Sequence, residues 1–221
     1  MCGIDLFRWR MSNQYRVVTV VNGVWRQNCY LIVNEKNQLI IIDPGSNAEN
    51  IVNKINELNV NLVAILNTHA HYDHIGAVSF LVQKYGIPFY LHKGDEKLMK
   101  QANLYKILFE SKESVVIPSF DKDLAQVSSE FLIGDFSIKI IHTPGHTPGS
   151  LCILIGNNIF GGDTLMPNGP GRTDLPGGNK RDMELSMNNL RQFSDNFLVY
   201  PGHGHPFTLG TFWSKNFATE Y

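Results

Sequence analysis

The chain has 221 residues, of which 43% are hydrophobic and 18% are charged, a composition typical of a folded globular protein. It carries 19 basic and 20 acidic side chains, which gives a net charge of −1. This balance argues against nucleic acid or an anionic membrane as the main partner, because such binding depends on many surplus cations.

The apolar runs are all far too short to cross a bilayer, and the N-terminus shows no apolar signal region. Cys2, Cys29 and Cys152 are widely spaced and do not suggest a disulfide framework. We therefore expect free thiols and a cytoplasmic location.

Residues 1–14 are mixed in character and are predicted to be an N-terminal extension of a single domain spanning 15–221. In the first half, runs rich in Val, Ile and Tyr predict strands, and apolar residues at helical spacing predict helices. The strands are expected at Tyr15–Val21, Cys29–Val33, Gln38–Ile42, Val60–Leu66 and Phe89–His92. Helices are expected around Ile51, Ile55 and Leu58, over His74–Tyr85 and over Glu96–Glu110.

The second half repeats this order of strands followed by strand–helix units. Strands are expected at Phe131–Ile133, Phe136–His142, Ser150–Ile155, Asn158–Phe160 and Phe197–Tyr200, with a helix over Asp182–Gln192. Two such halves predict one α/β sandwich, in which two sheets pack together with the helices outside.

Seven residues of the kinds that bind zinc, iron and manganese occur in four short segments. Four lie in Thr68-His69-Ala70-His71-Tyr72-Asp73-His74, and the other three, His146, Asp163 and His203, each lie in a Gly-containing turn. A structural alternative is that they are turn and cap residues satisfied by the backbone. That alternative suits Asp43 or Asp163 taken singly, but five His and two Asp together need a shared partner.

The spacing also suggests how these residues divide between two ions. His69 and His71 are two apart, so on an extended segment they point to the same side. Asp73 and His74 follow where the chain turns into a helix, so they can serve a second ion. The predicted groups are His69, His71 and His146 around one ion, Asp73, His74 and His203 around the other, and Asp163 as a bridge.

Five further residues have more ordinary interpretations. His92 and His142 are expected to be partly buried and hydrogen-bonded, and Tyr72 is expected to pack in the core. Asp43 is either an acceptor that orients a ligand imidazole or a turn former before Pro44. His205 is expected either near the site or outside it.

The chain resembles the metallo-β-lactamase superfamily from Tyr15 to Gly210. Within it, the motifs resemble the glyoxalase II (hydroxyacylglutathione hydrolase) branch. The motifs concerned are Asn28-Cys29-Tyr30, Ile42-Asp43-Pro44-Gly45, Thr143-Pro144-Gly145-His146-Thr147-Pro148-Gly149-Ser150 and Gly162-Asp163-Thr164-Leu165. The resemblance implies the αββα fold, with two mixed sheets and helices on the outside, and the same seven metal ligands.

One loop departs from the glyoxalase II pattern. Gly169-Pro170-Gly171-Arg172-Thr173-Asp174 replaces a segment that carries a Lys and a Tyr for glutathione in that enzyme. Arg172 is expected to replace the Lys as a clamp for a substrate carboxylate. Asp174 has no phenol and does not replace the Tyr.

The predicted function is hydrolysis of a glutathione thioester such as S-lactoylglutathione. Two divalent ions, zinc first and iron or manganese as alternatives, would generate a hydroxide that attacks the carbonyl. Asp73 would orient it and accept its proton. The alternative from another class is a persulfide dioxygenase, in which His69, His146 and Asp163 hold one iron. Other superfamily hydrolases, such as lactonases and β-lactamases, come next. The sequence is silent on oligomeric state.

Overall fold

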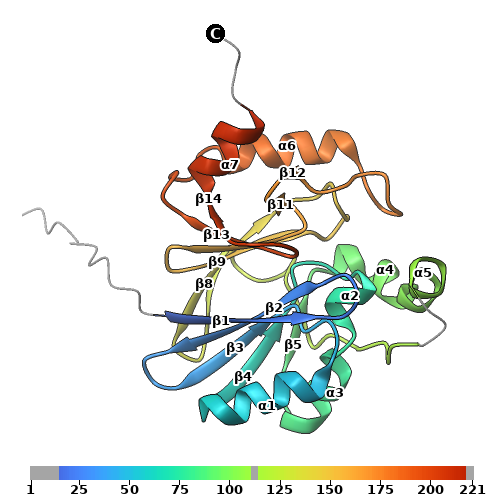
Figure 1. Cartoon of the computed structure of the whole chain (residues 1–221), viewed down its shortest axis with the longest axis vertical. Helices are drawn as coiled ribbons and strands as arrows, with labels where there is room; N and C mark the ends of the chain where they lie inside the picture. The colour runs from blue at the N-terminus through green and yellow to red at the C-terminus, as the bar shows by residue number, and fades with distance from the viewer. Residues whose placement is uncertain (1–14, 111–113, 218–221) are drawn as a thin grey trace, which may run out of the picture.

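A computed structural model describes residues 15–110 and 114–217 of the chain (Figure 1). The predicted extension, residues 1–14, and Cys2 within it lie outside these ranges. Two six-stranded sheets face each other, and helices lie on the outer face of each sheet. The predicted αββα sandwich is confirmed.

The first sheet takes its strands in chain order. They are β1 (Tyr15–Asn22), β2 (Gln27–Asn34), β3 (Gln38–Ile42), β4 (Asn61–Leu66), β5 (Phe89–Leu91) and β6 (Lys122–Asp123). β1, β2 and β3 pair antiparallel, whereas β3 to β6 pair parallel. The sheet is therefore mixed, as expected.

The second sheet is also mixed, because β10 and β13 pair parallel while its other neighbours pair antiparallel. Its order is β14 (Phe207–Thr208), β13 (Leu198–Pro201), β10 (Asn158–Gly162), β9 (Leu151–Ile155), β8 (Phe136–His142) and β7 (Glu130–Ile133). A separate two-stranded ribbon joins β11 (Leu165–Met166) to β12 (Gly169–Pro170).

The helices form the two outer layers (Figure 1). Those that accompany the first sheet are α1 (Ala48–Leu58), α2 (Tyr72–Ile75), α3 (Val78–Tyr85), the 3₁₀ turn η1 (Lys93–Asp95), α4 (Glu96–Lys100) and α5 (Ala102–Phe109). Those that accompany the second sheet are α6 (Lys180–Leu190) and α7 (Leu209–Asn216).

Successive side chains of β3 enter two different apolar clusters, and this arrangement holds the layers together. Leu39 and Ile41 join the cluster beneath α1 and α3, whereas Ile40 and Ile42 join the central cluster between the sheets. Successive strand residues point to opposite faces, so an all-apolar run suits a strand that is covered on both sides. Full burial of each such side chain contributes about 1.5–3 kcal/mol.

Two predicted helices are each split in the structure. The helix expected over His74–Tyr85 is interrupted at Gly76, where a side-chain Cβ would lie 2.2 Å from the Gly45 carbonyl oxygen. The helix expected over Glu96–Glu110 is interrupted at Gln101, between α4 and α5. The apolar pattern continues across Gln101, so the sequence gives no sign of that break, whereas Gly76 is itself a weak helix former.

The final helix, α7, was not predicted. The Thr208 side chain caps it by accepting a hydrogen bond from the Thr211 N–H, and Phe212 is buried against the second sheet. At eight residues it is too short for a clear helical period.

The fold brings the four segments that carry the predicted ligands together at one edge of the sandwich. They follow the carboxyl ends of β4, β8, β10 and β13, which belong to both sheets. Within residues 15–110 and 114–217, no helix has the length and apolar character needed to traverse a bilayer.

Candidate metal centre

The segment after β4 has the local geometry that its spacing predicts. His71 is extended, with φ −64° and ψ 149°, and α2 begins at Tyr72. His69 and His71 therefore project toward one point from an extended chain. Asp73 and His74 lie on the first helical turn and face a second point.

Three imidazoles converge at the first point. Nε2 of His69 lies 3.0 Å from Nδ1 of His71, and Nε2 of His146 lies 2.9 Å from the same atom. Ligands held 2.0–2.1 Å from a tetrahedral zinc ion are separated by about 3.3 Å. The three nitrogens therefore have nearly the spacing that a single ion requires.

Asp73, His74 and His203 form the second group. Oδ2 of Asp73 lies 3.3 Å from Nε2 of His203 and 3.8 Å from Nε2 of His74. These residues come from α2 and from the turn after β13, so both sheets contribute to this group as well.

Asp163 lies between the two groups and faces both. Its Oδ1 is 3.6 Å from Nε2 of His74, while its Oδ2 is 3.5 Å from Nε2 of His146 and 3.7 Å from Nε2 of His203. One carboxylate thus reaches imidazoles of both groups, which is the position that a bridging ligand needs.

Hydrogen bonds on the far side of two imidazoles set their orientation. Nδ1–H of His146 donates to the carbonyl oxygen of Arg172 at 2.8 Å, and Nδ1–H of His203 donates to that of Trp25 at 2.9 Å. With the proton on Nδ1, the lone pair of Nε2 points into the centre, as metal ligation requires.

Asp43 orients the imidazole of His74 directly and that of His69 through Thr68. Its Oδ2 accepts from Nδ1 of His74 at 3.0 Å and from the Thr68 hydroxyl at 2.6 Å. The Thr68 hydroxyl oxygen lies 3.1 Å from Nδ1 of His69, from which it can accept. Asp43 also has a positive φ of 51°, so it forms the turn before Pro44 as well.

Two buried atoms in the centre have no hydrogen-bond partner among the described residues. They are Nε2 of His74 and Oδ1 of Asp163. They face one another at 3.6 Å, which is too long for a hydrogen bond. An unsatisfied buried polar group is costly, and a cation between the two atoms would satisfy both. The residues present therefore fit divalent metal ions.

The protonation states of one imidazole and two carboxylates also suit metal binding. Burial and the neighbouring His146 lower the pKa of His71 to about 3. Burial alone would raise the pKa values of Asp73 and Asp163, but the facing imidazoles hold both below their usual range. At neutral pH this part of the site thus offers a neutral imidazole and two carboxylates, the forms that bind metal.

Asp95 supports the site in a way that the sequence did not reveal. Its buried carboxylate accepts from Ala70 N–H at 2.9 Å, Thr147 hydroxyl at 2.8 Å and Gly149 N–H at 2.6 Å. Ala70 lies between two of the imidazoles, and Thr147 follows His146. Asp95 therefore fixes two ligand-bearing segments relative to each other.

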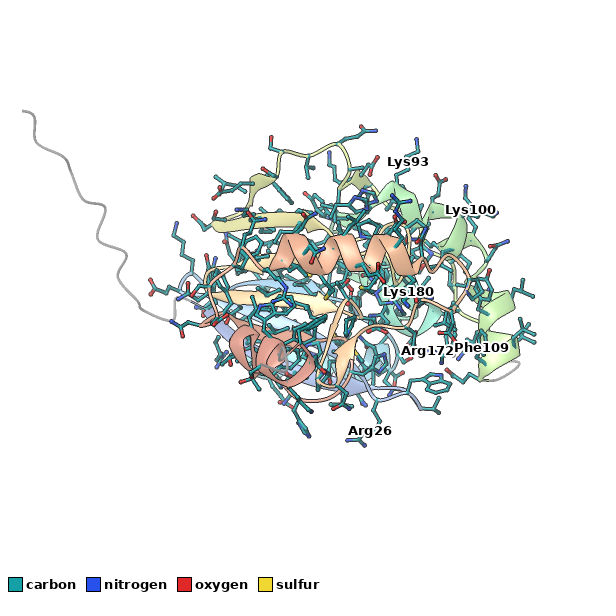
Figure 2. The ribbon with its side chains drawn as sticks, turned by 90° about the horizontal axis from the view of Figure 1, so that it is seen from above. Arg26, Lys93, Lys100, Phe109, Arg172 and Lys180 are labelled. Carbon is teal, nitrogen blue, oxygen red and sulfur yellow. The ribbon has the colours of Figure 1, made fainter. Side chains whose placement is uncertain are left out.

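A pocket of about 530 Å³ opens beside the two groups. His71, Asp73, His146, Asp163 and His203 contribute to its floor, and most of its remaining lining is apolar. Arg172 and Phe109, which are labelled near each other in Figure 2, both line this pocket.

Arg172 does not stand alone at the pocket. Its Nε and Nη2 donate to the two carboxylate oxygens of Asp174 at 3.0 and 2.9 Å. Both side chains are exposed, so the pair contributes little to stability. The predicted carboxylate clamp is thus engaged by an acidic neighbour two residues away.

The other singled-out residues lie outside the metal centre or at its border. His92 and His142 stack at a centroid distance of 4.3 Å, and each makes a backbone hydrogen bond, although His142 is exposed. His205 is exposed and does not line the pocket. Tyr72 packs in the core, as expected, and its edge reaches the pocket.

A family model described as the metallo-beta-lactamase superfamily matches residues 22–205. The chain is 33% identical over 194 residues to hydroxyacylglutathione hydrolase GloC of Haemophilus influenzae, covering 84% of this chain and 89% of that protein. The chain belongs to the metallo-β-lactamase superfamily, and it is a metal-dependent hydrolase of that class.

Two solved structures share the whole architecture. The BLEG-1 B3 metallo-beta-lactamase superposes with a TM-score of 0.84 at 30% identity, covering 90% of this chain and 97% of that one. TTHA1623 in a di-iron-bound form gives a TM-score of 0.81 at 31% identity, covering 90% and 98%. The resemblance to the superfamily is thereby confirmed.

Proposed function

We propose that the chain hydrolyses thioesters of glutathione, of the S-lactoylglutathione type, at a pair of divalent ions. The proposed ligands are His69, His71 and His146 for one ion, Asp73, His74 and His203 for the other, and Asp163 for both. The position of the Asp163 carboxylate, which faces imidazoles of both groups beside an open pocket, is the observation that carries this proposal.

When bound, the ions lower the pKa of water toward neutrality, which supplies a hydroxide nucleophile, and they polarise a carbonyl oxygen. Asp73 is ionised and lines the pocket, so it can orient a water molecule and accept its proton. The water oxygen then bonds to the thioester carbon and the C–S bond breaks. The thiolate leaves without a general acid, because a thiol has a pKa of about 8.5.

Arg172 supplies the contact expected for glutathione. Its guanidinium is exposed at the rim and is planar, so it can take a carboxylate through two hydrogen bonds. For a substrate carboxylate to bind there, it must displace or share Asp174. The similarity to GloC supports glutathione as the thiol.

Zinc is the metal that we propose first, because imidazole and carboxylate ligands suit it. The relative that was solved in a di-iron-bound form supports iron as a second occupant. His and Asp ligands also suit manganese.

The test is turnover of S-lactoylglutathione by metal-replete protein, followed as loss of thioester absorbance. We expect hydrolysis that a chelator abolishes and that added zinc restores. A cephalosporin serves as the comparison substrate. Oxygen consumption with glutathione persulfide, together with one iron per chain and no thioester turnover, would instead establish the dioxygenase alternative.

A further inference from the structure

The walls of the pocket differ in character from its floor. Its lining includes Trp25, from the turn between β1 and β2, and Tyr105 and Phe109 from α5. It also includes Met166 from β11, and Leu175 and Pro176 from the loop after β12. Figure 1 shows α5 and that loop on the same side of the molecule. Together with Tyr72, four aromatic rings and three apolar side chains thus line the pocket beside the candidate metal centre.

Two of these rings are left half exposed by the protein itself, whereas Tyr105 is partly buried against the core. Trp25 and Phe109 are each 49% exposed. Aromatic side chains carry large apolar surfaces, and their removal from water is strongly favourable. Rings that stay half exposed around a concave site are available to cover an apolar part of a ligand.

The small number of charged groups in the pocket also favours an apolar ligand. Among the described residues that line it, Arg172 is the one basic side chain besides the histidines, and it is already paired with Asp174. Lys93 and Lys100 lie across α6 from Arg172 in Figure 2 and do not line the pocket. Apart from Asn168 and the hydroxyls of Tyr72 and Tyr105, the walls therefore offer one carboxylate contact and apolar surface.

We propose that the substrate is a thioester with an apolar acyl group, either an aromatic ring or a chain of several carbons, held against Trp25 and Phe109. This inference rests on the proposed thioester hydrolysis and narrows its substrate class. A lactoyl group has one methyl and one hydroxyl, so it leaves these rings uncovered. The remaining contact, Arg172, would take a carboxylate of the thiol by displacing or sharing Asp174.

A substitution of Trp25 can remove its ring from the pocket without removing the hydrogen bond that its backbone makes. Its carbonyl oxygen accepts the Nδ1–H of His203, whereas its ring lines the pocket. Trp25→Ala removes the ring and retains that carbonyl. Phe80→Ala is a matched control for Phe109→Ala, because Phe80 is 47% exposed on α3 and does not line the pocket.

The experiment compares S-phenylacetylglutathione with S-lactoylglutathione in the metal-replete full chain, so that only the acyl group differs. For the parent protein we expect kcat/KM to favour the phenylacetyl thioester by about 10-fold or more, as apolar pockets typically discriminate. Trp25→Ala and Phe109→Ala should each reduce this ratio about 10-fold, and Phe80→Ala should leave it unchanged. A ratio near one, or one that neither variant changes, would overturn the proposal.

A binding measurement keeps this inference separate from the proposed reaction. S-(2-phenylethyl)glutathione and S-methylglutathione are thioethers that cannot be hydrolysed and differ only in the apolar arm. Calorimetry should give at least about 10-fold tighter binding of the phenylethyl compound, reduced by Phe109→Ala and not by Phe80→Ala. Equal affinities would refute the apolar pocket even if thioesters are hydrolysed. A clear difference without thioester turnover would retain the pocket and remove the proposed reaction.

Discussion

Oδ2 of Asp43 lies 3.0 Å from Nδ1 of His74, although the two residues are 31 positions apart in the chain. The same carboxylate accepts hydrogen bonds from the backbone N–H and the hydroxyl of Thr68. One buried acid therefore orients an imidazole and fixes the strand end from which the ligand segment departs.

Asp43→Ala should weaken metal binding without removing any proposed ligand. Loss of an outer hydrogen-bond partner typically reduces metal affinity 10- to 100-fold, so we expect a decrease of about that size in a competitive chelator titration. Asp135→Ala is the control, because Asp135 forms an exposed pair with Lys36 away from the site. Equal affinity in the two variants would show that Asp43 only shapes the turn.

Asp163→Ala should empty at least one of the two proposed sites. Asp163 faces His74 through one oxygen and His146 and His203 through the other, so its removal takes a ligand from both groups. Elemental analysis should find at most one ion per chain after dialysis, against two in the parent protein. Two ions and normal activity in this variant would contradict the bridging role.

Gly45→Ala should destabilise the protein by about 3 kcal/mol or more, as expected for a clash with backbone. A Cβ at this position would lie 1.8 Å from the carbonyl oxygen of Asp73, a proposed ligand. Gly86→Ala separates this clash from ordinary strain, because Gly86 has a positive φ of 63° but no atom within 4 Å of an added Cβ. It should cost only about 1–2 kcal/mol. Urea unfolding of both variants measures the difference.

The metal-free protein should lose stability between pH 6.5 and pH 9. Burial disfavours the charged form of His74, but Asp73, Asp163 and Asp43 outweigh it and raise the pKa to about 9. The folded chain therefore binds this proton more tightly than the unfolded chain, whose His pKa is about 6.5. The resulting stabilisation is fully present below about pH 6.5 and is lost as the pH rises through about 9.

Chelator-treated protein, unfolded in urea at several pH values, should show this decrease. The decrease should be smaller in His74→Gln, where the raised pKa of His203 still contributes in the same direction. Zinc-loaded protein should not show it, because a bound ion takes the place of the proton. A flat profile for the metal-free parent would contradict the assignment.

Asp174→Ala should lower KM for glutathione thioesters, because it frees the guanidinium of Arg172 from its present partner. Arg172→Ala should raise KM about 10-fold or more, the typical effect of losing a charge-assisted hydrogen bond. The two variants thus move KM in opposite directions with little effect on stability, since exposed pairs contribute little. Steady-state kinetics with S-lactoylglutathione measures both KM values. A change of KM in the same direction in both variants would exclude Arg172 as the carboxylate clamp.

The sequence predicted the two sheets except for their two-residue strands β6 and β14, and spacing within one segment separates His69 and His71 from Asp73 and His74. The alternating and continuous apolar runs predict strands, and two histidines two apart on an extended segment must point the same way. The break at Gln101 was missed, since the apolar pattern on its two sides fits one continuous helix. Gly76 itself has helical dihedral angles, and the backbone N–H of the next residue, Ala77, donates to the Pro44 carbonyl oxygen at 3.0 Å, a tertiary contact that local sequence does not record.

The residues that support the site were harder to predict from the sequence than the proposed ligands. Asp95 directly precedes a helix, where Asp ordinarily caps the first turn. Its side chain makes no cap bond and instead contacts segments around Ala70 and Gly149. Trp25 reaches the site through a turn between two strands, and only the three-dimensional fold brings that turn to His203.

Two imidazoles of the metal centre, those of His146 and His203, are oriented by the main-chain carbonyls of Arg172 and Trp25. The side chains of Arg172 and Trp25 face the pocket. Because any amino acid supplies a carbonyl, substitutions at positions 25 and 172 can alter which molecule is recognised and leave the imidazoles aligned. A relative that shares this arrangement can therefore acquire a new substrate by exchanging two side chains, while the geometry of the proposed metal ligands is retained.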